Sequence, residues 1–302
     1  MPGKSPRRTV ALCAVSAALT LTAACGGASN ADSASDPDTL VMGLIPNENA
    51  ASLNASYQPL KDLIAEASGK EVELEVMTNY AALIEAQRAG TVHIAMYGPF
   101  SYVLAKDSGV DISPIAAELY EKGGDPSYHS YMVARADSGL TELSDLRGRT
   151  VCFVDPNSTS GRLYPLSGLM QAGLNEGDYT ERFAGGHDAS LLAVRDGDCD
   201  AGAVRDLLYE EVLPEQEGID HDDYTVLWKS DPVVNSPLAI LNSLDPELRE
   251  SISEAVLERG NADALGVDDI AGYWGFTEAD DAFYDPIREL CEITEAEACE
   301  AG

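Results

Sequence analysis

Hydrophobic positions in the first third of the chain alternate between the spacing of strands and that of helices. Short apolar runs predict strands at Thr39–Leu44, Glu71–Met77 and Val92–Tyr97. Apolar residues at helical spacing predict helices over Tyr57–Ser68 and Tyr80–Ala89. Strands that alternate with helices indicate a mainly parallel sheet covered on both faces.

The same alternation returns in the second half of the chain. Further strands and helices are predicted at Tyr131–Arg135, Thr150–Val154, Leu163–Ala172, Asp188–Arg195, Cys199–Val204 and Thr225–Lys229. Ser236–Leu241 is typical of a return crossing, and helices follow from Pro246. We therefore expect an α/β protein with two lobes and a central ligand cleft, lobe 1 being residues 39–130 completed by 237–302 and lobe 2 residues 131–236.

The N-terminus has the layout of a secretory signal. Basic residues precede the apolar run Val10–Leu21, which is too short to span a membrane. Small residues then lead to Cys25, as in a lipobox, so we expect a lipoprotein signal peptide over residues 1–24, lipidation of Cys25 and a flexible tether over 25–38. Ordinary secretion, with cleavage after Ala24 or the alanine before it, is the alternative.

Composition narrows the choice of partners. The chain carries a formal net charge of −33. This charge argues against binding nucleic acid or the surface of an anionic membrane, and leaves the N-terminal lipid as the only expected membrane contact. A small anion is still a possible ligand, because backbone amides can make one site locally positive without lysine or arginine.

Cysteine usage fits an oxidising location. Beyond the signal and the lipobox, Cys152, Cys199, Cys291 and Cys299 remain, and four cysteines allow three pairings. We favour Cys152–Cys199 and Cys291–Cys299. No pair has CxxC or HxxxH spacing, so no metal or other cofactor is expected.

The stretch 154-VDPNSTSG-161 joins a predicted strand to a predicted helix. The first N–H groups of a helix lack intrahelical partners, and the helix dipole adds partial positive charge there. Ser158, Thr159 and Ser160 would supply further donors to an oxyanion. A plain helix cap is the alternative, but a cap needs only one such residue. The run of hydroxyl side chains therefore favours an anion site.

Four other residues follow predicted strands or begin helices. His187 opens a second strand-to-helix junction and could offer a hydrogen bond or, if protonated, a positive charge. Tyr97 ends a strand, Tyr80 begins a helix, and Asn47 follows the first strand, where ligands of α/β proteins commonly lie. Capping and packing are the alternatives for each. The chain lacks GxSxG, GxxxxGK[ST] and GxGxxG motifs, so no catalytic residue is predicted.

Several segments together resemble the phosphonate-, phosphite- and phosphate-binding proteins of ABC importers, the PhnD-like family. They are 43-GLIPNENA-50, 79-NYAALIEAQRAGTVHIAMYGPFSYVLA-105, 154-VDPNSTSGRLYP-165, 185-GGHDASLLAVRDGDCDAGAV-204 and 227-LWKSDPVVNSPLAI-240. The resemblance implies a type II periplasmic-binding-protein fold that closes on an oxyanion. It also implies that Ser158, Thr159 and Ser160 bind the phosphorus oxygens, that His187 and Tyr97 complete the site, and that Tyr80 lines it.

The chain departs from family members that bind aminoalkyl phosphonates. Those members have an acidic residue just after the strand equivalent to Cys199–Val204, where this chain has Arg205, Asp206 and Leu207. Asp206 could replace that residue, although a count of positions aligns Leu207 with it. The departure favours phosphate, phosphite or a short alkylphosphonate.

The sequence thus predicts a monomeric, lipid-anchored solute-binding protein at the extracellular face of the membrane. It would capture a phosphorus oxyanion and deliver it to the permease of an ABC transporter. A secreted enzyme acting on phosphoesters and a ligand-sensing module for a membrane kinase are the alternatives.

Overall fold

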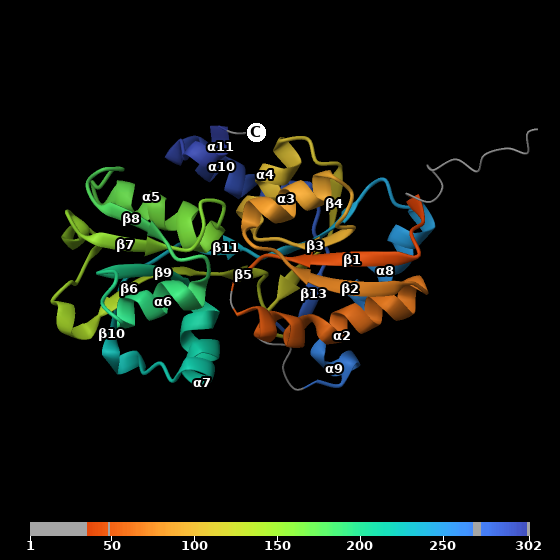
Figure 1. Cartoon of the computed structure of the whole chain (residues 1–302), viewed down its shortest axis with the longest axis horizontal. Coiled ribbons are helices and arrows are strands. Elements are labelled where there is room, and N and C mark those ends of the chain that lie inside the picture. The colour runs from red at the N-terminus through yellow and green to blue at the C-terminus, as the bar shows by residue number, and fades with distance from the viewer. Residues whose placement is uncertain (1–34, 48, 268–272, 301–302) are drawn as a thin grey trace, which may run out of the picture.

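The computed structural model describes residues 35–47, 49–267 and 273–300. The predicted signal peptide, Cys25 and most of the tether lie outside the described residues. Two lobes lie side by side, each built around its own sheet (Figure 1). Two chain segments connect them.

The first lobe contains a six-stranded sheet with the order β13-β4-β12-β3-β1-β2. Its strands are β1 (Thr39–Leu44), β2 (Glu71–Val76), β3 (Ile94–Met96), β4 (Ile112–Leu119), β12 (Pro237–Leu241) and β13 (Gly275–Thr277). Its helices are α2 (Ala50–Ser68), α3 (Tyr80–Arg88), α4 (Pro99–Asp107), α8 (Pro246–Arg259) and α9 (Ala262–Leu265). β1 runs parallel to β2 and β3, whereas β12 lies antiparallel between β3 and β4.

The second lobe contains a five-stranded sheet with the order β10-β6-β9-β7-β8. Its strands are β6 (Ser130–Arg135), β7 (Thr150–Phe153), β8 (Thr180–Phe183), β9 (Ala201–Arg205) and β10 (Tyr224–Lys229). Its helices are α5 (Tyr164–Gln171), α6 (His187–Arg195) and α7 (Leu213–Glu217), and π turns η3 (Thr159–Leu163) and η4 (Leu208–Val212) precede α5 and α7. Short 3₁₀ turns are η1 (Ala136–Ser138), η2 (Leu143–Leu146) and η5 (His221–Asp223).

Two expectations about the elements were wrong. Both sheets are mixed, because the chain returns from the second lobe as β12 and runs against β3 and β4, the latter a strand that the sequence pattern did not indicate. In the second lobe β6 likewise runs against β9 and β10. Helix α2 begins at Ala50, seven residues before the expected start at Tyr57, because the Asn49 side chain caps it by accepting the Ala51 N–H at 2.9 Å.

The two connecting segments pair with each other. β5 (Ser127–Tyr128) and β11 (Val233–Val234) form a short antiparallel ladder between the lobes. The first connection runs from β4 to β6 and the second from β10 to β12. Because both chain connections between the lobes pass through this ladder, it is the natural hinge for a motion of the lobes.

Two disulfides reinforce the fold, in the pairing favoured from the sequence. Cys152 and Cys199, with Cα atoms 5.8 Å apart, join β7 to the turn before β9 inside the second lobe. Cys291 and Cys299, 5.9 Å apart, join α10 (Asp285–Thr294) to α11 (Glu297–Glu300). Both therefore lie within one part of the molecule and leave the connection between the lobes free.

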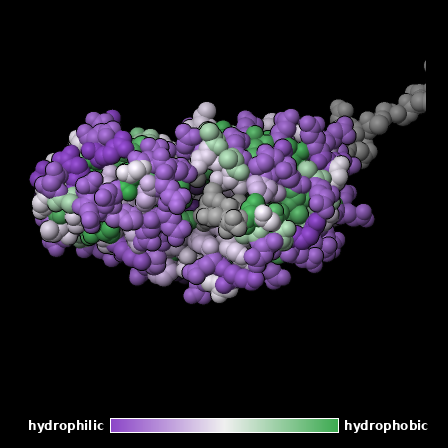
Figure 2. Space-filling model, turned by 90° about the horizontal axis from the view of Figure 1, so that it is seen from below, coloured by the Kyte–Doolittle hydropathy of each residue, from purple (hydrophilic) through white to green (hydrophobic). Residues whose placement is uncertain are grey.

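The surface agrees with the acidic composition. The face shown in Figure 2 is mostly hydrophilic, with hydrophobic side chains in separate small patches. Among the described residues, the large hydrophobic side chains that are exposed are Phe183, Val226 and Ile293. None of the described helices has the length and apolar character needed to cross a bilayer.

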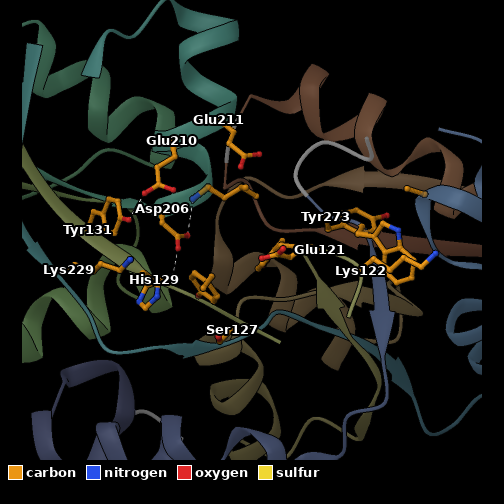
Figure 3. A pocket seen from close by; sticks show the side chains of 15 residues that line it. Glu121, Lys122, Ser127, His129, Tyr131, Asp206, Glu210, Glu211, Lys229 and Tyr273 are labelled. Atoms are coloured by element: carbon orange, nitrogen blue, oxygen red, sulfur yellow. Dashed lines mark hydrogen bonds between the residues drawn. The ribbon is translucent and has the colours of Figure 1, made fainter. Parts of the chain in front are cut away.

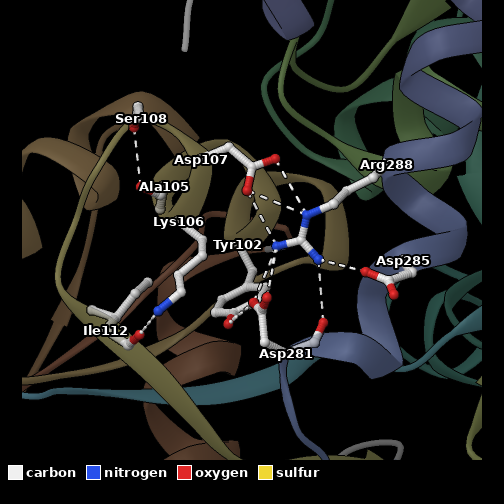
Figure 4. A network of polar contacts seen from close by, with 9 residues as sticks. All are labelled: Tyr102, Ala105, Lys106, Asp107, Ser108, Ile112, Asp281, Asp285 and Arg288. Atoms are coloured by element: carbon white, nitrogen blue, oxygen red, sulfur yellow. Dashed lines mark hydrogen bonds and ion pairs between the residues drawn. The ribbon is translucent and has the colours of Figure 1, made fainter.

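Helix α10 lies across the boundary between the lobes (Figure 1) and packs against α4 of the first and α5 of the second. Arg288 fixes α10 to the first lobe (Figure 4). Its guanidinium contacts Asp107 at 3.2 Å, Asp281 of the 3₁₀ turn η6 (Asp281–Tyr284) at 3.1 Å and Asp285 at 3.0 Å. Tyr102 of α4 donates to Asp281 at 2.6 Å. One arginine thus links three carboxylates.

Arg288→Ala should lower the free energy of unfolding by about 1–2 kcal/mol, because it leaves Asp107 and Asp281 close together without a cation. Arg259→Ala is the matched control, since Arg259 pairs with Glu66 alone at 2.8 Å and both side chains are exposed. It should change stability by less than about 0.5 kcal/mol. Chemical denaturation measures both, and equal effects would contradict the role given to the Arg288 network.

Candidate functional site

The loop between β7 and α5 holds its hydroxyl residues in a fixed, buried turn. Ser158 caps the turn, and its Oγ accepts the Gly161 N–H at 3.1 Å. A Cβ atom at Gly161 would lie 2.4 Å from the Cβ of Val154, so only glycine lets the loop pack this closely on the strand. Ser158, Thr159 and Ser160 are each only 2% exposed.

This loop meets the first lobe at the N-terminus of α4. Thr159 Oγ1 accepts the backbone N–H of Phe100 at 2.9 Å. That N–H belongs to the first turn of α4, which has no side-chain cap of its own. The hydroxyl of Tyr80, at the start of α3, is hydrogen-bonded to the hydroxyl of Ser158. The start of η3 therefore faces the starts of two helices across the cleft.

His187 begins α6 and makes a second contact across the cleft. Its backbone N–H donates to the carbonyl of Asn47 at 2.8 Å, and its Nδ1 accepts the backbone N–H of Arg205 at 3.2 Å. Burial lowers the pKa of His187 to about 3. The imidazole is therefore neutral near pH 7 with its proton on Nε2, so it can act as a hydrogen-bond donor but not as the cation considered from the sequence.

A small inner cavity lies beside these contacts. It is lined by Leu44, Ile45, Asn47, Leu53, Tyr57, Met96, Tyr97, Glu118, Arg205 and Ser236, and its volume is about 10 Å³. That is roughly the space that one water requires. Three of these residues have buried polar atoms without a hydrogen-bond partner among the described residues: Asn47 Oδ1, the Tyr97 hydroxyl, and Nε and Nη2 of Arg205. Because such atoms are rare in folded proteins, their convergence indicates a ligand site.

Arg205, the last residue of β9, brings a cation to this cavity. It pairs with Ser130 in the β6–β9 ladder, and Ser130 Oγ donates to the carbonyl of Ser160 at 2.6 Å. This pairing places Arg205 beside the hydroxyl loop. Its guanidinium lies over the rings of Tyr120 and Tyr128, at 4.4 and 4.9 Å from their centroids. This arginine was not among the ligand-binding residues expected from the sequence.

Glu118 in β4 is the counter-charge of Arg205. Its carboxylate is buried and accepts hydrogen bonds from the hydroxyls of Tyr57 at 2.9 Å and Tyr120 at 3.1 Å. Nη2 of Arg205 lies 3.8 Å from Glu118 Oε2. Burial raises the pKa of Glu118, and Arg205, Tyr57 and Ser236 each oppose that rise. The cavity thus contains one acidic and one basic side chain, Glu118 and Arg205, rather than a single charged residue.

The sequence reasoning missed both charged residues, although it contained a signal for each. Glu118 is the one charged residue of β4, the strand that was not anticipated. Arg205 directly follows the predicted strand Cys199–Val204, the position expected to point into a cleft, but that position was searched only for an acid. Both residues could have been identified as charged side chains within, or at the end of, an otherwise apolar strand.

Asp206 lies apart from the inner cavity. Its carboxylate accepts the backbone N–H groups of His129 at 2.7 Å and Leu207 at 2.8 Å. It lines an outer cleft of about 730 Å³ whose walls come from both lobes (Figure 3). Asp206, His129 and Glu210 lie on the wall of the second lobe, and Lys122 and Tyr273 on that of the first.

The predicted residues thus fall into four places. Asn47 and Tyr97 line the inner cavity, whereas Asp206 lines the outer cleft. Tyr80 and the hydroxyl residues lie beside this cavity, where the two lobes are in contact. His187 lies next to Arg205. No cluster of three or more His, Cys, Asp or Glu side chains in the described part of the chain could hold a metal ion.

The chain resembles known proteins over most of its length. The family model described as the periplasmic substrate-binding protein of phosphonate ABC transporters matches residues 42–284. The chain belongs to this family. A member, the phosphate-import protein PhnD of Mycolicibacterium smegmatis, is 35% identical over 302 residues, covering 92% of this chain and 94% of that protein.

Solved structures of related proteins share the fold of this family member. A binding-protein component of an ABC phosphonate transporter from Pseudomonas aeruginosa superposes with a TM-score of 0.77 at 24% identity, covering 85% of this chain and 86% of that one. PhnD1 from Prochlorococcus marinus, in complex with methylphosphonate, gives 0.77 at 22% identity, covering 86% and 99%. The fold is that of type II periplasmic binding proteins, as expected from the sequence.

The low pKa of His187 should make stability depend on pH. In the unfolded chain a histidine has a pKa near 6.5, so between pH 6.5 and 3 the unfolded state binds the proton and the folded state does not. The wild-type protein should therefore lose stability relative to His187→Gln as pH falls, by up to about 1.4 kcal/mol per pH unit. Urea unfolding of both proteins from pH 7 to pH 4 measures this. Parallel stability curves would show that His187 is not held neutral by the fold.

Proposed function

We propose that this protein captures phosphate, phosphite or a short alkylphosphonate outside the cytoplasm and delivers it to the permease of an ABC importer. The observation that carries the proposal is the convergence of unpartnered donors on the inner cavity, from Tyr97 in one lobe and Arg205 in the other. The hydroxyl loop Ser158–Ser160 and the Nε2–H of His187 add donors that can act on the same anion.

Capture requires the lobes to move. An oxyanion needs several times the volume of the inner cavity, so the ligand enters only when the walls separate. Opening would break the Thr159–Phe100 and His187–Asn47 contacts, and closing would remake them around the ligand. The ladder of β5 and β11 would serve as the hinge. Exclusion of water strengthens every donor–anion interaction, because the effective dielectric falls.

The relatives support a phosphorus ligand. One is named for phosphate import, and another was solved with methylphosphonate. The arrangement of the hydroxyls supports binding rather than catalysis. Ser158 Oγ accepts a backbone N–H, and His187 Nδ1 is occupied by that of Arg205, so neither takes part in a nucleophile–base pair. We infer that the protein is a carrier and turns over no phosphoester.

Isothermal titration calorimetry tests the assignment of the site. The mature protein should bind at least one of phosphate, phosphite and methylphosphonate, and Thr159→Ala should weaken that binding by about 1–3 kcal/mol through loss of a hydrogen bond to a charged group. Thr180→Ala, an exposed threonine at the start of β8, is the control and should bind like the wild type. If no phosphorus oxyanion binds to the wild type, the proposed function is wrong.

We also propose that Cys25 carries a lipid that anchors the protein, as a monomer, to the extracellular face of the membrane. Cys25→Ser should move the protein from the membrane fraction into the medium, because a lipid chain supplies the membrane affinity that an acidic surface lacks. Immunoblots of both fractions measure this, and uptake of radiolabelled phosphate or phosphite should fall in parallel. An unchanged distribution would contradict the anchor. Loss of the gene without loss of uptake would favour the sensing alternative.

A further inference from the structure

Glu118 and Arg205 together suggest how the site recognises its ligand. We propose that this pair selects oxyanions that carry a proton: Arg205 donates to a deprotonated oxygen, and Glu118 accepts a hydrogen bond from a P–OH group. The inference rests on the proposed function and refines it, because it predicts strong preference for phosphorus oxyanions over sulfate.

Arg205 has N–H groups that are available to a ligand in the inner cavity. Two of its nitrogens, Nε and Nη2, are buried without a hydrogen-bond partner in the described part of the chain. Tyr120 and Tyr128 hold the guanidinium by ring stacking, which consumes none of its N–H groups. A planar guanidinium with two adjacent free N–H groups matches two oxygens of an oxyanion.

Glu118 has acceptor positions left. An ionised carboxylate offers about four lone-pair positions. Hydrogen bonds from Tyr57 and Tyr120 use two of them. The contact with Arg205, at 3.8 Å, is too long for a hydrogen bond and uses none. Glu118 and Arg205 both line the inner cavity, so one ligand there can meet the acceptor and the donors together.

These two groups impose opposite demands on a ligand. At neutral pH inorganic phosphate still carries at least one proton, so it presents deprotonated and protonated oxygens together. Sulfate has lost both protons at neutral pH and presents only acceptors. It would satisfy Arg205 but would place an unprotonated oxygen against the buried carboxylate of Glu118. Such like-charge contact costs several kcal/mol at an interface.

A purely structural ion pair would look different. Its partners would lie within hydrogen-bond distance and would satisfy each other, since a buried guanidinium left half-satisfied costs stability. Here the carboxylate is held by two tyrosine hydroxyls and the guanidinium by two rings, so neither depends on the other for its position. The gap between them leaves both charges available to a third group.

Calorimetric titration of the mature protein with phosphate and sulfate at pH 7 tests the proposal. The wild type should prefer phosphate by at least about a hundredfold. Glu118→Gln should reduce that ratio at least about tenfold, because the amide can donate to an unprotonated sulfate oxygen. Glu121→Gln removes the same charge from the outer cleft and should keep the wild-type ratio. Arg205→Gln should weaken binding of both anions at least about tenfold.

Glu118→Asp covers the case in which the glutamine variant does not fold. The shorter side chain keeps the charge beside Arg205 but withdraws the acceptor, so phosphate affinity should fall while sulfate affinity stays low. Circular dichroism establishes that each variant is folded. An unchanged phosphate-to-sulfate ratio in a folded Glu118 variant overturns this inference while leaving phosphate capture intact. Failure of the wild type to bind phosphate, phosphite or methylphosphonate overturns the proposed function itself.

Discussion

Two hydrogen bonds across the cleft each join a helix start in one lobe to the facing lobe. Thr159 Oγ1 accepts from Phe100, and the carbonyl of Asn47 accepts from His187. In each, the donor is a backbone N–H in the first turn of a helix, which has no partner within its own helix. The groups best suited to an anion thus bind the facing lobe when the lobes are closed. A ligand whose oxygens reach this region competes for the same N–H groups when the lobes open. When the lobes close, these contacts enclose the ligand.

Charge makes the inner cavity the exception within the molecule. The chain carries −33, so its long-range field repels anions and provides no electrostatic steering. Attraction must come from groups that act only at short range, in a region where water is excluded. Arg205, stacked on two tyrosines, and the helix starts meet that requirement. The balancing carboxylate of Glu118 keeps the cavity from acting as a general trap for negative charge. Selectivity then depends on hydrogen-bond direction more than on net charge.

How far the sequence predicts this structure depends on the range of the interactions involved. The hydroxyl loop could be located because its signal is local: hydroxyl residues that follow a strand are typical of the start of a helix. β4 was missed because it pairs with β12, more than a hundred residues later, in a direction that local periodicity does not encode. Glu118 was missed with it, since its burial depends on Tyr57 of α2, which is distant in the sequence. Asp206 was expected at the ligand, but its carboxylate binds amides of His129 and Leu207.

The C-terminal helices add a constraint on how the lobes separate. Arg288 fastens α10 to α4, and Cys291–Cys299 fastens α11 to α10, so this region should move with the first lobe. Its contacts with α5 and with η3 of the second lobe must then yield when the cleft opens. Because η3 is the turn that carries Thr159 and Ser160, those contacts bear directly on the loop that we propose binds the ligand. Opening therefore requires changes at the hinge ladder, at the helix starts and at α10 together, which favours two discrete arrangements of the lobes over a continuous range.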